Sequence, residues 1–454
     1  MVRRILVLSA AFLAVPGDVA AALPGELAFA LGTLSFLFWG ALVMWMCAGF
    51  TMLEAGSVAT RNASTVCLKN IGLYSIAGLT FYLYGYGLMF GTGQMSGALP
   101  LGILHQLTTA EQAVVAGAAD GTIEVVTTGH AAMSGWFFQM VFVASACSIV
   151  SGTLAERVKL LPFFIFITIM TTIIYPVVGS WTWGGGWLFQ LGFKDFAGAT
   201  VVHSTGGWCA LAGAIVVGAR RGKFRNDGTV KVTPPNNVPI VTLGIFIIWF
   251  GFIGFNGGSR LAMGADADAV AVGLVVVNTN LAAAAGTVTA LLLSRPVFGR
   301  IDLLVTLNGA VAGLVAITAA PDITEHNWAI AIGAAGACCC LAARKLLEWL
   351  KVDDEVGAIA THMGAGIWGT LAVCIAAGGS VLVQWLGVVA VGIFAFGVSI
   401  SLWRMIDVIL GARIAPDVET IGQDRATLGI ETYPEFVSVD GDSDGSERSG
   451  ENTA

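Results

Sequence analysis

Long apolar stretches separated by short polar segments dominate this chain. We find eleven of them, each long enough to cross a bilayer as a helix, which takes about 20 apolar residues. They lie at 28–54, 66–92, 132–154, 159–181, 196–218, 237–259, 268–292, 301–319, 328–349, 357–377 and 381–411. The pattern predicts an all-α polytopic membrane protein with eleven transmembrane helices.

The two ends of the chain do not follow this pattern. Residues 1–22 combine two arginines, a short apolar run and a small-residue stretch, which is typical of a secretory signal peptide. From residue 414 the sequence turns polar and acidic, and we interpret 414–454 as a cytoplasmic tail. Residues 23–413 are expected to form the membrane domain between them.

The positions of lysine and arginine predict how the chain is oriented. Setting aside Arg3 and Arg4, eighteen of the remaining twenty lie in loops that follow odd-numbered spans, at the adjoining helix ends or in the tail; only Lys194 and Arg260 do not. Basic residues concentrate on the cytoplasmic side of membrane proteins. We therefore expect a protein of the cell inner (cytoplasmic) membrane, with its N-terminus outside and its C-terminus in the cytoplasm.

Composition agrees with a membrane protein and narrows the function. The 454 residues are 56% hydrophobic and only 11% charged, which no soluble domain of this length resembles. A net charge of −7 without a basic, aromatic-laced patch argues against binding to nucleic acid. The eight cysteines lack the paired spacing of metal ligands, so we expect no metal and no cofactor.

Two short motifs recur within the chain. The first and sixth spans both end in Gly-Phe, five further residues and Gly-Ser, at 49–57 and 251–259. The fifth and tenth spans each hold a histidine, His203 and His362, followed four residues later by glycine. Spans one to five and six to ten therefore look like two copies of one unit.

Two copies of five spans each must lie in opposite orientations, because five is odd. We predict an inverted five-plus-five repeat, with repeat 1 at about 28–218, repeat 2 at about 237–377 and an extra helix 11 at about 381–411. Inverted repeats are typical of transporters, whose functional site lies near the membrane midplane between the halves.

His203 and His362 are the candidate chemical groups. An ionisable side chain at membrane depth normally faces the bundle interior or a cavity. No intramembrane carboxylate pair and no His-Glu-x-x-His motif accompanies them, which disfavours a carboxylate cation site and a zinc enzyme. Two imidazoles can exchange protons and hydrogen-bond a small polar solute. The alternative is a pair of buried structural histidines.

Four motifs give the chain a resemblance to the ammonium transporter (Amt/Mep/Rh) superfamily, from about residue 30 to 413. They are Asp195-Phe-Ala-Gly-Ala-Thr-Val-Val-His203, Phe255-Asn-Gly-Gly-Ser259, Gly152-Thr-Leu-Ala-Glu-Arg157 and His362-Met-Gly-Ala-Gly-Ile-Trp-Gly-Thr. The segment Leu53-Glu-Ala-Gly-Ser and the retained tryptophans resemble Amt proteins more than Rh proteins.

The resemblance implies a pore and its lining. His203 and His362 correspond to the twin histidines that line the pore of this family, and Phe142 and Phe255 to the stacked phenylalanines that gate it. Phe138 corresponds to an aromatic just above the gate. Without the resemblance, the phenylalanines would be interpreted as ordinary packing residues.

An outer recruitment site is also implied. Trp183 and Ser259 correspond to residues of that site, and Asp195 to an acidic residue that supports it without touching the ion. Trp183 as a membrane-interface tryptophan and Asp195 as a plain helix cap are the alternatives. Met363 stands where relatives commonly have glycine, and we expect it to narrow the pore below the histidines.

The resemblance implies a homotrimeric ammonium transporter or channel, not an enzyme, that moves ammonium or ammonia and accepts methylammonium as an analogue. A PII-type regulatory protein is an expected partner at the cytoplasmic face, although the tail lacks the histidine-glycine element common in the family. Two alternatives are an ammonium sensor that acts through a partner and an Rh-like gas channel.

Overall fold

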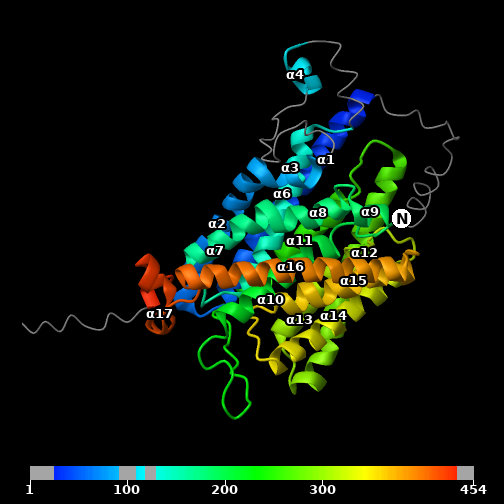
Figure 1. Ribbon diagram of the computed structural model, residues 1–454. Helices are drawn as coiled ribbons and strands as arrows, with labels where there is room; N and C mark the ends of the chain where they lie inside the picture. Colours follow the sequence, from blue (N-terminus) through cyan, green and yellow to red (C-terminus); the bar gives the residue numbers. More distant parts are fainter. Residues whose placement is uncertain (1–24, 92–108, 118–128, 437–454) are drawn as a thin grey trace, which may run out of the picture.

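The computed structural model describes residues 25–91, 109–117 and 129–436 (Figure 1). These residues form a bundle of helices, and no β-strand is assigned among them. Within the described part of the chain, ten helices are long and apolar enough to cross a membrane, and an eleventh, Leu303–Ile317, is shorter but also apolar. The predicted all-α polytopic membrane fold is confirmed. The predicted signal peptide, 1–22, lies outside the described residues.

Several membrane-spanning segments are assembled from consecutive helical pieces. In chain order the elements are α1 (Gly25–Ser57), η2 (Thr60–Asn62), α2 (Ala63–Thr80), η3 (Phe81–Gly85), α3 (Tyr86–Phe90), α4 (Thr109–Val115), α6 (Ala132–Thr153), α7 (Leu160–Ile169), η5 (Met170–Ile174), α8 (Tyr175–Thr182), α9 (Trp187–Gln190), η6 (Ala199–Ser204), α10 (Thr205–Val217), α11 (Val238–Gly258), α12 (Asp266–Phe298), α13 (Leu303–Ile317), α14 (His326–Trp349), η7 (Ile359–Gly364), α15 (Ala365–Ala376), α16 (Val381–Leu410), α17 (Pro416–Ile421), η8 (Asp424–Leu428) and η9 (Pro434–Phe436).

The histidine-bearing spans begin with π-helical turns, which the sequence pattern did not indicate. His203 lies in η6, directly before α10, and His362 lies in η7, directly before α15. Such wide turns are rare and often mark functional sites. The two repeats thus use the same local structure at the position of their histidine.

Small residues let the two halves approach closely. The first helices of the two repeats, α1 and α11, pack along a seam where a Cβ atom on Gly244 would lie 2.6 Å from the backbone nitrogen of Leu53. Near the histidines, a Cβ atom on Gly366 would lie 2.5 Å from the carbonyl oxygen of Ala199. Glycine at these positions permits backbone contact that larger side chains would prevent.

Met363 does not lie where the sequence analysis expected it. A Cβ atom added to Gly207 would lie 2.6 Å from the Cβ atom of Met363, so Met363 packs against α10. It is not among the described residues that line the small space beneath His362. Met363 therefore takes part in the close contact between the two repeats.

A buried ionic network ties together three loops at one end of the bundle. Arg220 pairs with Glu156, with Asp353 and with Glu355. Arg157, which is fully buried, donates to the carbonyl oxygens of Thr153, Gly218 and Asp353. Burial by itself raises the pKa of Asp353, but the guanidinium groups of Arg157 and Arg220 outweigh it and hold that pKa below its ordinary value.

The described part of the C-terminal tail, 414–436, docks on this same end of the bundle. The carboxylate of Asp424 accepts hydrogen bonds from the backbone N–H groups of Ser64 and Thr65 and from the Thr65 hydroxyl. Asp424 therefore caps the first turn of α2 from a position about 360 residues later in the chain. In Figure 1, α17 and the neighbouring tail residues are red and lie beside the start of α2.

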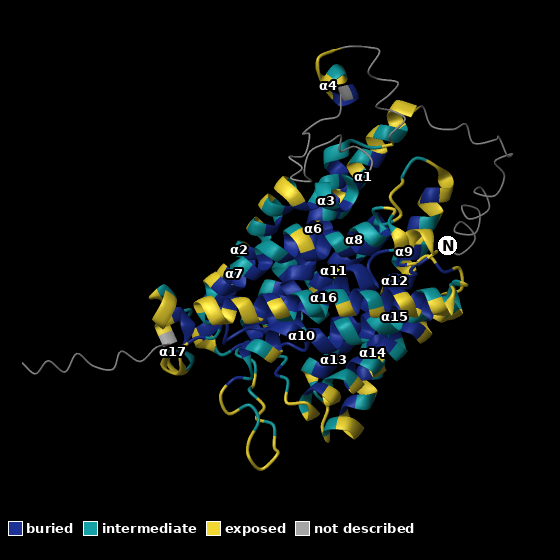
Figure 2. Cartoon of the chain, in the orientation of Figure 1, coloured by how far each residue is buried: buried dark blue, intermediate teal, exposed yellow. Residues whose placement is uncertain are grey.

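The distribution of burial suits a membrane environment. Figure 2 shows a buried interior surrounded by exposed outer helix faces. Many of the exposed side chains are large and apolar; on α16, for example, Leu382 is 78% and Ile393 70% exposed. Apolar outer faces of this kind fit lipid or a neighbouring protein surface and not water.

Candidate functional site

The two membrane-depth histidines meet in the interior of the bundle. The Nδ1 atoms of His203 and His362 lie 3.2 Å apart, and the ring centroids are 5.2 Å apart. Both side chains are buried, with exposed fractions of 1% and 2%. One histidine comes from η6 in repeat 1 and the other from η7 in repeat 2, so the contact joins the two halves.

The contact between the two rings dictates what their outer nitrogen atoms can do. In a neutral pair, one Nδ1 carries a hydrogen and donates it, and the other Nδ1 accepts. Because a neutral imidazole carries one hydrogen, the donor ring presents an acceptor at Nε2 and the acceptor ring presents a donor there. The Nε2 atom of His203 is buried and has no partner among the described residues. A solute with both N–H groups and a lone pair could satisfy both nitrogens.

Asp195 builds the turn that presents His203. Its carboxylate accepts four backbone N–H groups, from Gly198, Ala199, Thr200 and Val201, at 2.7–3.1 Å. Burial raises the pKa of Asp195 to about 6, while these N–H groups oppose the rise. Each carboxylate oxygen accepts two backbone N–H groups, which agrees with a supporting role.

A stack of phenylalanine rings lies against the histidine pair. Phe142 and Phe255 face each other at 3.9 Å between centroids with only 18° between their planes. Phe255 also stacks on His203 at 5.2 Å, and Phe138 adjoins Phe142 at 4.7 Å. All three phenylalanines are buried. An apolar barrier of two rings, Phe142 and Phe255, therefore lies on one side of the histidine pair.

A cavity of about 690 Å³ lies beyond this barrier and is lined by Phe142, Trp183, Asp195 and Ser259, among others. We name it the Trp183 cavity. The indole Nε1 of Trp183 donates to the carbonyl oxygen of Asp195 at 3.0 Å, which fixes the ring. Ser259 Oγ donates to the carbonyl oxygen of Phe255 at 2.8 Å, which leaves the lone pairs of the hydroxyl available as acceptors.

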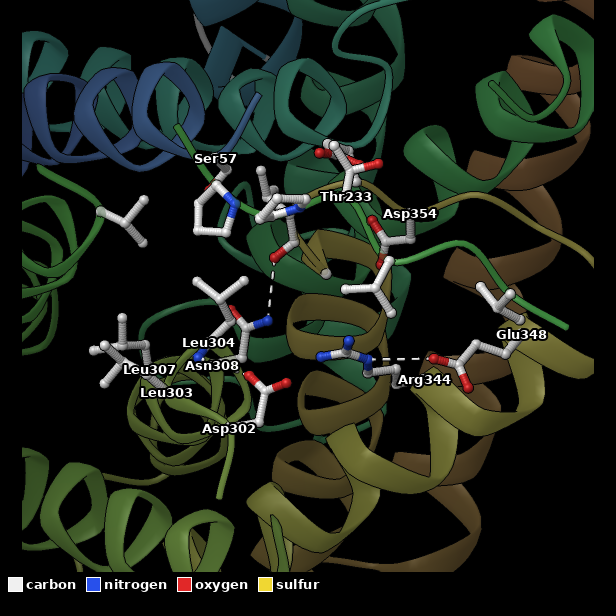
Figure 3. Close-up of a pocket in the computed structure, with 18 of the residues that line it drawn as sticks. Ser57, Thr233, Asp302, Leu303, Leu304, Leu307, Asn308, Arg344, Glu348 and Asp354 are labelled. Carbon is white, nitrogen blue, oxygen red and sulfur yellow. Dashed lines mark hydrogen bonds and ion pairs between the residues drawn. The ribbon is translucent and has the colours of Figure 1, made fainter. Parts of the chain in front are cut away.

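The other side of the histidine pair, next to His362, also leads to a cavity. A space of about 10 Å³ beneath His362 is lined by Phe50, Leu53, Asn308 and Val356, among others. Leu53, Asn308 and Val356 also line a cavity of about 510 Å³, which we name the Asp354 cavity (Figure 3). These shared residues mean that the small space adjoins this cavity. The Trp183 cavity, phenylalanine stack, histidine pair and Asp354 cavity thus follow one another through the bundle.

The residues on the His362 side of this route, including Asn308 and Asp354, are not among those predicted from the sequence. The signal was present, because 354–362 repeats the Asp-x-x-Gly-x-x-x-x-His pattern of 195–203. No signal of comparable clarity marks Asn308, which reaches the route from α13 only through the fold.

Comparisons with known proteins agree with the resemblance seen in the sequence. Residues 34–433 match the model of the Ammonium Transporter Family. The ammonium transporter Amt2 of Archaeoglobus fulgidus is 36% identical over 436 residues, an alignment that covers 89% of this chain and 88% of the relative. The ammonium transporter of Bacillus subtilis is 31% identical and covers 90% of this chain and 100% of its own length.

Solved structures show the same relationship. A sensor Amt protein aligns with a TM-score of 0.79 at 35% identity, covering 89% of this chain and all of that chain. Mep2 of Candida albicans aligns with a TM-score of 0.72 at 26% identity, covering 88% of this chain and 90% of that chain. With a family match over most of its length and relatives above 30% identity, this chain belongs to the ammonium transporter family.

Proposed function

We propose that this protein conducts ammonium, or ammonia derived from it, across the cytoplasmic membrane along the route between the two cavities. The observation that carries this proposal is the contact between His203 and His362, which leaves the buried Nε2 atom of His203 without a partner among the described residues, on an otherwise apolar path. Ammonia, a small solute with N–H groups and a lone pair, suits such a pair.

The Trp183 cavity has the chemistry of a recruitment site. An indole ring attracts a cation by about 0.5–2 kcal/mol, and the lone pairs of Ser259 Oγ accept an N–H group. The backbone turn beneath is held by Asp195, whose carboxylate also places negative charge beside the cavity. A small ammonium ion is therefore held where its N–H groups meet an oxygen and its charge meets an aromatic face.

The phenylalanine stack explains how ammonium would be distinguished from other cations. A barrier made of Phe142 and Phe255 offers no oxygen to replace the water around an ion, and passage of a hydrated ion is unfavourable. Ammonium can lose a proton and cross as ammonia, which potassium cannot do. The histidines beyond the barrier then provide a donor and an acceptor for ammonia and a route for a proton.

The positions of lysine and arginine indicate how the pore is oriented in the membrane. The eighteen-to-two distribution of lysine and arginine supports a location in the cell inner membrane with the Trp183 cavity outside and the Asp354 cavity toward the cytoplasm. We propose a homotrimer with one pore in each subunit, methylammonium as an alternative substrate, and the docked tail as the surface that a PII-type partner would contact.

A second function, ammonium sensing, is favoured by one specific observation. The sensor Amt protein aligns over all of its own length at 35% identity. In a sensor, binding at the Trp183 cavity would alter the cytoplasmic surface, where the tail contacts the first turn of α2 through Asp424. Transport and sensing predict different results when purified protein is studied without any partner.

The deciding experiment is an ammonium pulse given to purified protein in liposomes, with current and internal pH recorded together. A transporter produces a saturable signal that disappears in a His203→Ala, His362→Ala double variant reconstituted at the same density. A current without a rise in internal pH indicates that the transported species is ammonium, or ammonia together with a proton. A rise in internal pH without a current indicates that ammonia alone is transported. Saturable ammonium binding with neither signal would replace transport by sensing.

A further inference from the structure

The route carries the same local structure at both of its histidines. Residues 195–203 and 354–362 share the Asp-x-x-Gly-x-x-x-x-His pattern. The glycines of both copies have left-handed backbone conformations, with φ of 109° at Gly198 and 79° at Gly357. A side chain rarely adopts such a conformation, so both turns depend on glycine.

The aspartates of the two copies make corresponding hydrogen bonds. Asp195 Oδ2 accepts from the backbone N–H of Val201, six residues later, at 2.8 Å. Asp354 Oδ2 accepts from the N–H of Ala360, also six residues later, at 3.1 Å. The other oxygen of Asp354 accepts from the Thr153 hydroxyl at 3.0 Å. Asp354 is therefore a positioning residue for the turn that presents the second histidine.

The correspondence extends to the residues that line the two cavities. The recurring Gly-Phe, five residues, Gly-Ser motif pairs Ser57 with Ser259 and Leu53 with Phe255. Ser259 lines the Trp183 cavity, and Ser57 lines the Asp354 cavity. Leu53 takes the place of the gating phenylalanine, so the barrier on this side has no stacked pair of rings.

The side chain that lies beside the glycine differs between the two turns. A Cβ atom on Gly198 would lie 3.0 Å from the ring of Trp183, whereas a Cβ atom on Gly357 would lie 2.5 Å from Nδ2 of Asn308. Asn308 Nδ2 donates to the carbonyl oxygen of Val356 at 3.1 Å (Figure 3). No described residue donates to Asn308 Oδ1. The side chain beside the second turn is thus an amide, whose oxygen has free acceptor capacity, and not an indole.

We infer that Ser57 of α1 and Asn308 of α13, which line the cavity beside the turn positioned by Asp354, form a second ammonium-binding site at the mouth opposite Trp183. This inference rests on the proposed function, since it assigns the exit of the same pore. Two neutral oxygens accept N–H groups, and the Asp354 carboxylate supplies negative charge at the wall of the same cavity. Neither Ser57 nor Asn308 offers an aromatic face, so this site binds ammonium more weakly than the Trp183 cavity and favours release.

The cations in the Asp354 cavity do not oppose such a ligand. Arg344 pairs with Glu348 at 3.6 Å, and Arg300 with Asp302 at 3.3 Å. Lys223 lies 3.8 Å from Asp353. Each of these positive groups therefore lies beside a carboxylate, although Asp353 is shared with Arg220 and Glu348 with Lys345. None of these ion pairs involves Asp354.

Membrane vesicles of the two orientations separate the two sites. Uptake of labelled methylammonium into right-side-out vesicles begins at the Trp183 cavity, and uptake into inside-out vesicles begins at the Asp354 cavity. The quantity to compare is the ratio of the half-saturation concentration in inside-out vesicles to that in right-side-out vesicles. We expect Asn308→Leu and Ser57→Ala each to raise this ratio by roughly 2- to 10-fold, the effect of one lost hydrogen bond. Ser259→Ala should shift the ratio in the opposite direction.

Thr233→Ala is the matched control, because Thr233 lines the same cavity but lies outside the proposed site. Its ratio should equal that of the wild type. An unchanged ratio in both Asn308→Leu and Ser57→Ala, with protein that remains extractable and monodisperse, would overturn the second site while leaving transport established. Wild-type vesicles that accumulate nothing in either orientation would instead overturn the proposed function, and this inference with it.

Discussion

The Nδ1 atoms of His203 and His362 lie 3.2 Å apart although the residues are 159 positions apart in the chain. The contact joins the two repeats and directs one nitrogen of each ring away from the other ring. A hydrogen bond between the rings also fixes which nitrogen donates and which accepts. The pair therefore acts as one unit with two complementary ends, and its chemistry depends on both members.

Because the pair acts as a unit, either single substitution should remove its function. We expect His203→Ala and His362→Ala each to abolish the ammonium-specific signal, or to replace it by unselective current. Uptake of labelled methylammonium and current in liposomes measure the two outcomes, and elution of the purified protein checks that it remains folded. Wild-type uptake in both variants would show that the histidines do not line the pathway.

Replacing the indole should weaken recruitment and leave the histidine pair intact. Loss of a cation–π contact of about 0.5–2 kcal/mol predicts a roughly 2- to 30-fold higher half-saturation concentration for Trp183→Leu. Concentration-dependent currents measure the shift. Trp187→Leu is the control, because Trp187 lies nearby in α9 but does not line the cavity. Equal shifts in both variants would make Trp183 an ordinary interfacial tryptophan.

Selectivity tests the role of the phenylalanine barrier and the histidines together. Potassium and ammonium are similar in size, so a barrier without oxygens must separate them by the proton or by N–H bonding. We expect a large excess of potassium neither to carry current nor to inhibit ammonium uptake. A His203→Asp, His362→Glu double variant should conduct potassium, since fixed negative charge favours any small cation at that depth.

Two results would contradict this account of selectivity. Potassium current through the wild-type protein would show that ions cross the stack of Phe142 and Phe255 without losing a proton. A double variant that conducts ammonium and still excludes potassium would transfer selectivity from the histidine pair to the Trp183 cavity.

The tail contact should contribute to stability in the way that a helix cap does. Asp424→Ala removes three acceptor contacts at the start of α2 and is expected to lower the free energy of unfolding by about 0.5–2 kcal/mol. It should also accelerate limited proteolysis of the tail. Glu431→Ala is the control, because its ion pair with Arg425 is solvent-exposed and contributes little. Equal proteolysis of both variants would argue against capping by the tail.

Acid should weaken the loop network around Asp353. Because Arg157 and Arg220 hold the pKa of Asp353 below its ordinary value in the folded protein, the charged carboxylate stabilises the fold. The contribution is complete above the unfolded-state pKa of about 4 and is lost as the pH falls through the lower, folded-state pKa. Thermal unfolding in detergent should therefore show a melting temperature that drops below about pH 4.

An Asp353→Asn variant separates this effect from general acid unfolding. It leaves Arg220 with fewer carboxylate partners, so it should be less stable than the wild type at neutral pH. Its melting temperature should also depend less on pH in the acid range. A variant whose acid dependence equals that of the wild type would assign the effect to other carboxylates.

The sequence by itself determined the membrane class and the spans of this protein. All eleven predicted spans correspond to helices, because a stretch of about 20 apolar residues has few stable alternatives to a membrane helix. The family resemblance rested on equally local information, since motifs such as 195–203 can be identified without a fold. The sequence also showed the internal repeat, in the Gly-Phe and Gly-Ser pairs and in the histidines.

Only the tertiary structure decided which of these residues meet and how. Hydropathy carries no information about π-helical turns, about the packing of Met363 against α10, or about Asn308, which reaches the pathway from a different helix. The tail looked merely polar and acidic, yet Asp424 caps a helix far away in the chain. Such contacts join distant segments, and they arise from packing geometry that no local pattern encodes.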